Sequence, residues 1–390
     1  MQANTMTASL APNPGRRSRS CRPAAPTVEL LEQRQFLSAA PDLFTQTNLV
    51  ANVGSVAGAT TDPNLVHPWG IAINPANGAI WVSDNGSGLS TAYTDHGANT
   101  GPIVAIPPPT GASVGSAPTG IVFNNTSSFV VHNQTTSGAS AYVFATEIGT
   151  ISGWAPSVDL NNAILAVDNH TSGAVYKGLA MAQRGSASFL YAADFHNGRI
   201  DVFDSSFHPV TIAHAFHDPS LPAGFAPFNV ANIGGSLYVT YAKQDAVKHD
   251  DIPGAGLGYV DVYNSDGKLV KRFASKGSLD APWAVVRAPA GFGPFGGDIL
   301  VGNFGDGRIN VFSTNGLFVA TLKKTGGQPI AIGGLWGLQF GNGTTAGKKT
   351  TLFFAAGPNG ALKGLLGKLD PKPATSPSPS PSPGPYGWNY

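Results

Sequence analysis

WGIAINPANGAIWVSD, residues 69–84, is the stretch that decides the fold. It contains two short apolar strands joined by a turn, and the second strand ends in a small or acidic residue. The same phrase returns at Gly178–Asp194, Trp283–Asn303 and Trp336–Gly357. A unit of about fifty residues that cannot bury its own apolar face predicts an array of small sheets, and it favours a β-propeller.

Six copies of the phrase align on their first strands. These strands begin near Gly70, Gly120, Gly178, Asn229, Ala284 and Gly337. The third strands support the register, because Arg199–Asp204, Gly258–Asn264 and Arg308–Ser313 are near copies in which apolar and polar residues alternate. We therefore expect an all-β, six-bladed propeller over residues 42–370, with four-stranded antiparallel blades.

The last repeat is short by one strand. After Thr351–Ala355 only Gly364–Leu369 reads as a further strand, whereas Phe44–Val50 is a strand that precedes the first repeat. A propeller that completes its last blade with its N-terminal strand removes two exposed sheet edges. We predict that closure here.

Composition excludes some partners. Only 12% of the 390 residues are charged, against a typical quarter, and the net charge is +1. Residues 42–365 carry 16 Lys and Arg against 19 Asp and Glu, so no basic face for nucleic acid is indicated. No apolar run approaches the length of a transmembrane span. The single cysteine, Cys21, precedes the propeller. We expect the protein to be a monomer.

The two ends of the chain differ from the propeller. Residues 1–41 are expected to form an arm, in which Leu31–Ser38 resembles the LEPR-x-LL segment of many planctomycete exported proteins but departs from it at Gln33 and Phe36. Residues 371–390 are Ser/Pro-rich and predict an extended spacer. We expect export to the extracellular space or cell surface, and the alternative is an arm without a targeting role.

The turns and third strands together resemble NHL-type repeats. The chain as a whole is similar to an uncharacterised family of bacterial, exported six-bladed propellers. The segments that carry this resemblance are Thr47–Val50, Asp62–Gly70, Val82–Gly86, Tyr241–Asp245 and Gly302–Gly307. The resemblance implies a fold and no assigned activity.

One mouth of the central channel is the predicted binding face, because two kinds of loop open there. The candidates are His67, Trp69, Asp84, Asn85, Glu147, Asp194, His196, Asn229 and Asn303. Asp84, Glu147, Asp194 and Asn303 recur at similar places, so they either bond to their own turns or form a ring of ligands for Ca²⁺ or another divalent cation. Trp69, Trp283 and Trp336 are interpreted as wedges between blades, with a carbohydrate platform as the alternative.

The loop Lys243–Leu257 is longer than its counterparts in the other blades. It carries Asp245, His249, Asp250 and Asp251, which are candidate metal ligands or the polar residues of a capped loop.

Catalysis is poorly supported, and no catalytic residue is assigned. Glycosidases need a pair of carboxylates, yet Glu147 is the one Glu of residues 42–365. The fold resembles gluconolactonase-type propellers, which implies a metal held by a Glu of the first blade, and this chain has none there. The leading hypothesis is a module that binds a protein, glycan or small molecule, with a metal-dependent hydrolase or lactonase and a structural surface component as alternatives.

Overall fold

The computed structural model describes residues 43–113, 115–360 and 362–372. They fall in one compact unit, Ala40–Tyr390. The helices of the described residues are two short 3-10 turns, η2 (His170–Ser172) and η3 (Gly293–Phe295). No helix there is long and apolar enough to cross a bilayer. The predictions for residues 1–41 and for the Ser/Pro-rich tail from residue 373 lie outside the described residues.

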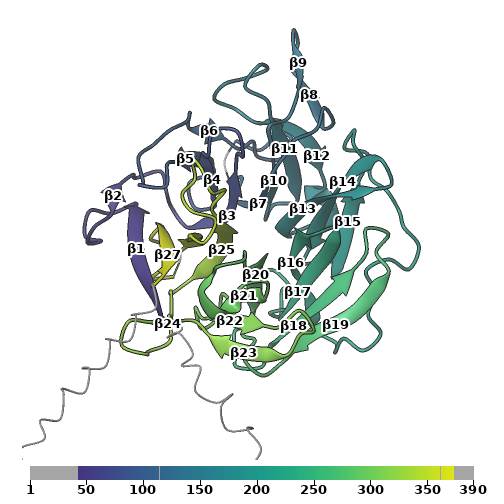
Figure 1. Ribbon diagram of the computed structural model, residues 1–390. Coiled ribbons are helices and arrows are strands. Elements are labelled where there is room, and N and C mark those ends of the chain that lie inside the picture. The colour runs from purple at the N-terminus through teal and green to yellow at the C-terminus, as the bar shows by residue number, and fades with distance from the viewer. Residues whose placement is uncertain (1–42, 114, 361, 373–390) are drawn as a thin grey trace, which may run out of the picture. The chain divides into compact units, whose positions relative to one another are not determined.

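Six sheets stand around a common axis, which Figure 1 views end-on. Blade 1 contains β3 (Pro68–Ile73), β4 (Ile80–Asp84), β5 (Leu89–Tyr93) and β6 (Val104–Ala105); blade 2 contains β7 (Pro118–Phe123), β10 (Tyr142–Thr146), β11 (Thr150–Trp154) and β12 (Ile164–Asp168). Blade 3 contains β13 (Tyr176–Arg184), β14 (Ala187–Asp194) and β15 (Arg199–Phe203); blade 4 contains β16 (Phe225–Ile233), β17 (Ser236–Lys243), β18 (Gly258–Tyr263) and β19 (Leu269–Ser275). Blade 5 contains β20 (Pro282–Arg287), β21 (Ile299–Asn303), β22 (Ile309–Phe312) and β23 (Phe318–Thr321).

Blade 6 joins segments from the two ends of the described chain. It contains β25 (Leu335–Phe340), β26 (Leu352–Ala356), β27 (Leu365–Pro371) and β1 (Leu43–Ala51), in that order from the axis outward. β1 runs antiparallel to β27, from Phe44 opposite Pro371 to Ala51 opposite Leu365. The short strands β2 (Thr60–Thr61) and β24 (Lys323–Lys324) add to the outer side of β1. The N-terminal strand thus occupies the outer position that the sixth repeat leaves empty.

Two blades depart from the regular plan. In blade 3 the fourth position is reduced to a bridge between Phe203 and Pro209, because proline has no N–H with which to continue a ladder. In blade 2 the turn-rich stretch after β7 contains an extra hairpin, β8 (Val130–His132) and β9 (Ser137–Ala139). All the innermost strands match the predicted ones: β3, β7, β13, β16, β20 and β25.

The innermost strands approach one another closely, and glycine permits it. A Cβ atom on Gly120 would overlap the backbone of Leu179 in the next blade, and one on Gly337 would overlap the carbonyl oxygen of Trp69. The recurrent glycine of the repeat is therefore required by backbone approach around the axis. The apolar side chains of the blades pack between neighbouring sheets.

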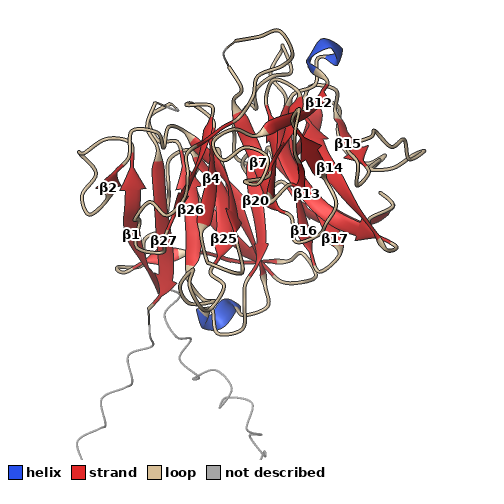
Figure 2. Ribbon diagram, turned by 90° about the horizontal axis from the view of Figure 1, so that it is seen from above, coloured by secondary structure: helices blue, strands red, loops and turns tan. Residues whose placement is uncertain are grey.

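The propeller has two different faces. The connections between blades, with η2, lie on one face, which we call the loop face. The turns between the first and second strands of the blades, with η3, lie on the opposite face. Figure 2 shows the two helices, in blue, on opposite sides of the strands.

Candidate functional site

The residue just before each recurrent glycine, or before Asn229 and Ala284 where the glycine is replaced, points toward the axis. Each innermost strand has a register shift at this position, and such a bulge re-aims a side chain. The six residues form what we call the axial ring: Trp69, Thr119, Lys177, Phe228, Trp283 and Trp336. All are at most 5% exposed, so the ring closes the channel at the loop face.

The three tryptophans of the ring contact one another. The rings of Trp69 and Trp336 stack with centroids 3.4 Å apart, and Trp283 meets both edge-on at 6.1 and 5.9 Å. Phe304, from the loop after β21, covers Trp336 at 4.1 Å. The tryptophans therefore form a buried plug at the axis, which is neither a set of separate wedges nor an exposed carbohydrate platform.

Lys177 is the charged member of the axial ring. Its side chain is 2% exposed, and its Nζ donates to Glu147 Oε1 from blade 2 and, at 3.1 Å, to Asp250 Oδ1 from the β17–β18 loop. Nζ also lies 5.4 Å from the centroid of the Trp69 ring. Burial works against the charge, but the two carboxylates raise the pKa of Lys177, so the ammonium stays protonated.

Glu147 lies one residue beyond the position predicted for it. Asp84, Asp194 and Asn303 each face the first residue of an innermost strand, and in blade 2 Thr146 holds that place. Glu147 therefore corresponds to Asn85, the residue after Asp84. Because successive strand residues point to opposite sides, Glu147 and Asp84 do not point the same way. The side chains of Glu147 and Asn85 meet, with Asn85 Nδ2 donating to Glu147 Oε2 at 2.8 Å.

The carboxylates and amide at the strand ends do not converge on the axis. Asp84 Oδ2 accepts from Thr91 Oγ1 at 2.8 Å, and burial raises the pKa of Asp84 well above its ordinary value. Asp194 Oδ1 accepts from two backbone N–H groups beside its own turn, at 3.1 and 3.2 Å. Asn303 Nδ2 donates to the Ser278 carbonyl oxygen at 2.8 Å. Asp84 Oδ1 and Asn303 Oδ1 are buried without a hydrogen-bond partner among the described residues. No group of described residues with a metal-like spacing includes Asp84 or Asp194, so the predicted ring of metal ligands is not formed.

His67 is held at the axis in a strained conformation. Its φ is 49°, in the left-handed region, where the corresponding residues of blades 2 and 5 are Ala117 and Ala281. Trp336 Nε1 donates to His67 Nε2 at 3.0 Å, and Trp69 Nε1 lies 3.4 Å from Nδ1. Burial lowers the pKa of His67 to about 4, so the imidazole is neutral near pH 7 and accepts from Trp336.

Two further predicted binding residues, Asn229 and His196, lie outside the Lys177 cluster. Asn229 accepts from Val230 N–H at 2.8 Å and donates to the Trp283 carbonyl oxygen at 2.9 Å, so it ties β16 to β20. The backbone carbonyl of His196 accepts from Gln244 Nε2 at 3.3 Å. Among the described residues no hydrogen bond or ion pair joins His196 to the Lys177 cluster.

The β17–β18 loop does not gather its four predicted metal ligands. Asp245 Oδ1 accepts from the His249 N–H at 2.9 Å, in its own turn, while His249 Nδ1 lies 3.0 Å from Asp250 Oδ1. Burial raises the pKa of Asp251 to about 7.

The group of described residues with a metal-like spacing is Glu147, His249 and Asp250, whose ligand atoms lie within 4.8 Å of one another. The Lys177 ammonium already contacts both carboxylates of that group and supplies the cation. These residues therefore do not suit a divalent ion, which the ammonium would repel.

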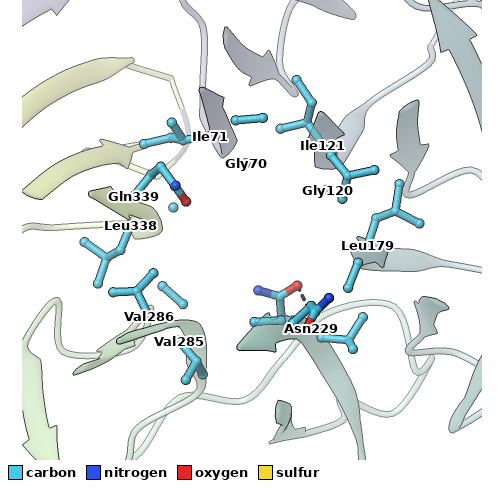
Figure 3. A pocket seen from close by; sticks show the side chains of 18 of the residues that line it. Gly70, Ile71, Gly120, Ile121, Leu179, Asn229, Val285, Val286, Leu338 and Gln339 are labelled. Carbon is cyan, nitrogen blue, oxygen red and sulfur yellow. Dashed lines mark hydrogen bonds between the residues drawn. The ribbon is translucent and has the colours of Figure 1, made fainter. Parts of the chain in front are cut away.

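A cavity of about 630 Å³ occupies the channel on the other side of the axial ring. Its walls are the innermost strands of all six blades, as Figure 3 shows. Of the predicted binding residues, Asn229 lines it. The polar candidates at the loop face and this cavity are thus separated by the plug.

Comparison with known proteins assigns the chain to a family of uncharacterised proteins. No family model matches it. It is 38% identical over 299 residues to an uncharacterised protein of Acanthamoeba polyphaga mimivirus, across 74% of this chain and 72% of that protein. The chain belongs to the family of that protein. A second uncharacterised protein of the same virus is 36% identical over 304 residues, across 75% and 78% of the two chains. These relatives support an uncharacterised propeller family, and they do not support the expected bacterial source.

Solved structures of other proteins resemble the fold of this chain. A protein of unknown function from Bacteroides thetaiotaomicron matches with a TM-score of 0.52 and 11% identity, across 84% of this chain and 76% of that one. A gluconolactonase from Xanthomonas campestris matches with a TM-score of 0.46 and 14% identity, across 79% and 86%. At these identities the likeness concerns the fold alone.

Lys177 is the site residue that the sequence prediction missed. A signal for it existed, because Lys177 precedes Gly178 just as Trp69 precedes Gly70 and Trp336 precedes Gly337. A lysine at a position that other blades fill with tryptophan marks a departure from the repeat.

Proposed function

We propose that the protein is a binding module whose loop face takes a small molecule, or the end of a chain, that carries a carboxylate or phosphate group. The ligand anion replaces Asp250 on Lys177. The observation that carries this proposal is a buried ammonium held by one fixed and one displaceable carboxylate. The Glu147 side chain is 13% exposed, whereas that of Asp250 is 68% exposed and belongs to a long loop.

The placement of Lys177 is expensive for stability, which supports a role in binding. Taking an ammonium out of water costs several kcal/mol, and replacing a buried ion pair by apolar residues is often neutral or stabilising. Four of the other five blades fill the ring position with Trp or Phe, and blade 2 fills it with the uncharged Thr119. Residues that break a local rule of this kind are expected at functional sites.

The surroundings of Lys177 favour an anion over a cation. A ligand cation would have to displace the buried ammonium itself, whereas an anion exchanges with a carboxylate on the surface. His67 is neutral and offers no competing charge. Asn85 keeps Glu147 oriented, so Lys177 retains one counter-charge while the second is exchanged.

The alternatives have less support. A lactonase of the gluconolactonase type requires oxygen ligands that converge at the axis, and the carboxylates and imidazole with a metal-like spacing among the described residues are those of Glu147, His249 and Asp250, which include neither Asp84 nor Asp194. Export and a role at the cell surface remain a proposal from the sequence. Fractionation of cells that express the full chain or a chain without residues 371–390 tests it.

Calorimetric titration tests the binding proposal. Glucuronate and inorganic phosphate are the anionic probes, and glucose is the neutral control. Asp250→Asn is expected to bind the anions about tenfold more tightly, since it frees Lys177 without removing it. Lys177→Met is expected to abolish binding. The matched control is Asp245→Asn, in the same loop but without contact to Lys177, which should leave affinity unchanged. Equal anion affinity in wild type, Asp250→Asn and Lys177→Met would refute the proposal.

A further inference from the structure

The channel cavity lies beyond the plug and opens away from the loop face. Its lining begins at Gly70, Gly120 and Gly337, the residues directly after the axial ring. It ends at Asn232, Gly234 and Arg287, which are exposed at the other ends of the innermost strands. Trp283 contributes to the closed end. At about 3.3 Å per residue, three to four strand residues give a depth of roughly 10–13 Å.

Aliphatic side chains line the middle of this cavity. Ile71, Ile121, Leu179 and Leu338 surround the opening in Figure 3. The Asn229 side chain is already occupied on both its donor and acceptor atoms. A cavity of about 630 Å³ falls in the range of sites that hold small molecules, which is about 300–1,000 Å³.

Arg287 stands at the rim of the cavity without a carboxylate partner. The other arginines of the described residues each form an ion pair with an aspartate: Arg184 with Asp266, Arg199 with Asp201, Arg272 with Asp218 and Asp261, and Arg308 with Asp306. Among the described residues Arg287 makes one side-chain hydrogen bond, from Nε to the Gly297 carbonyl oxygen at 3.1 Å. Its terminal N–H groups are therefore free for an anion.

Gln339 adds a second polar group to the same wall. Its side chain is drawn on the cavity wall in Figure 3 and makes no hydrogen bond to another described residue. A free guanidinium and a free amide towards the open end, with aliphatic side chains between them and the closed end, match a molecule with one polar head and an apolar body.

We propose that the channel binds an apolar carboxylic acid, with its hydrocarbon body between the innermost strands and its carboxylate on Arg287. This site is distinct from the Lys177 site, from which the tryptophan plug separates it. The two sites differ in the ligand they take, because the loop-face site is built on the buried ammonium of Lys177, whereas aliphatic side chains line the middle of the channel.

Titration calorimetry with decanoate, and with decanol as the uncharged counterpart, tests the proposal. Wild-type protein is expected to bind one decanoate. Arg287→Gln should weaken decanoate about tenfold and leave decanol unchanged, as loss of one charge-assisted contact predicts. Arg308→Gln, on the same blade but paired with Asp306, is the matched control and should change neither. Val286→Trp, which fills the cavity from a half-buried wall position, should abolish binding of both probes.

Three results would overturn the proposal. The first is no decanoate binding to the wild type. The second is equal affinity in wild type, Arg287→Gln and Val286→Trp. The third is loss of decanoate binding in Lys177→Met together with retention in Arg287→Gln, which would assign the anion to the loop face. Folding of each variant is checked by its thermal unfolding midpoint, and the Arg287→Gln comparison holds even if Val286→Trp fails to fold.

Discussion

The two halves of the axial ring are built differently. Blades 4, 5, 6 and 1 supply Phe228, Trp283, Trp336 and Trp69, whose aromatic rings pack against one another. Blades 2 and 3 supply Thr119 and Lys177, whose polar groups bond to Tyr176, Glu147 and Asp250. The aromatic half closes the axis by packing. The polar half closes the axis by charge pairing between blades. Charge pairing stabilises the fold less than aromatic packing does, but a ligand anion can replace one of the paired carboxylates. The ligand site is proposed there for that reason.

The largest expected effect is in the aromatic half. Trp336→Ala removes the stacking on Trp69 and Phe304 and the hydrogen bond to His67. We expect a loss of about 3–5 kcal/mol in the free energy of unfolding, as for other buried aromatic truncations. Denaturant unfolding measures it. Phe318→Ala, at a side chain that is 53% exposed, is the control and should cost less than about 1 kcal/mol.

The next effect is in the polar half. Glu147→Gln leaves the buried ammonium of Lys177 with the exposed Asp250 alone and is expected to cost about 3 kcal/mol. Adding Lys177→Met should recover most of that loss, because the unpaired charge is then gone. Unfolding of both single variants and the double variant measures the coupling. Additive losses would mean that the pair does not act as a unit.

His67, at the boundary of the two halves, should make stability depend on pH. Its pKa is about 4 in the folded protein and about 6.5 when unfolded, so the unfolded state takes up a proton first as pH falls. The stabilisation is complete above about pH 6.5 and is lost progressively towards pH 4, by about 3 kcal/mol. His67→Asn, which tolerates the left-handed backbone, should lack this dependence.

The pH comparison must be made between wild type and His67→Asn at each pH. Asp251, with a pKa raised to about 7, contributes the opposite sign, since its stabilisation fades as pH rises from about 4 to 7. Subtracting the variant removes that contribution. A difference between the two proteins that stays constant from pH 4 to pH 7 would contradict the assignment of His67.

The smallest effect separates the two partners of Lys177. Asp250→Asn should change the free energy of unfolding by less than about 1 kcal/mol, because this carboxylate is largely in solvent. The contrast with Glu147→Gln is the point of the measurement. If the two variants lose equal stability, Asp250 is a structural partner and the exchange with a ligand anion becomes untenable.

The site was less predictable than the fold. Glu147 was recognised but aligned with Asp84, Asp194 and Asn303, and a shift of one residue reverses the side to which a strand residue points. The sequence of the loop 243–257 predicts either metal ligands or the polar residues of a capped loop, whereas in the structure its Asp250 pairs with a lysine. The partner that explains Asp250 is Lys177, which lies in the preceding blade and is 73 residues away in sequence.

The sequence by itself determined the number of blades, the innermost strands and the strand that precedes the first repeat. These features depend on local alternation, glycine positions and a fixed period, all of which can be read along one chain. Tertiary structure alone decided that the residue before each glycine points to the axis, because a bulge changes the direction of one side chain without changing the strand pattern. It also decided that Lys177, Glu147 and Asp250 meet, since charges from three blades can be paired only once the ring has closed.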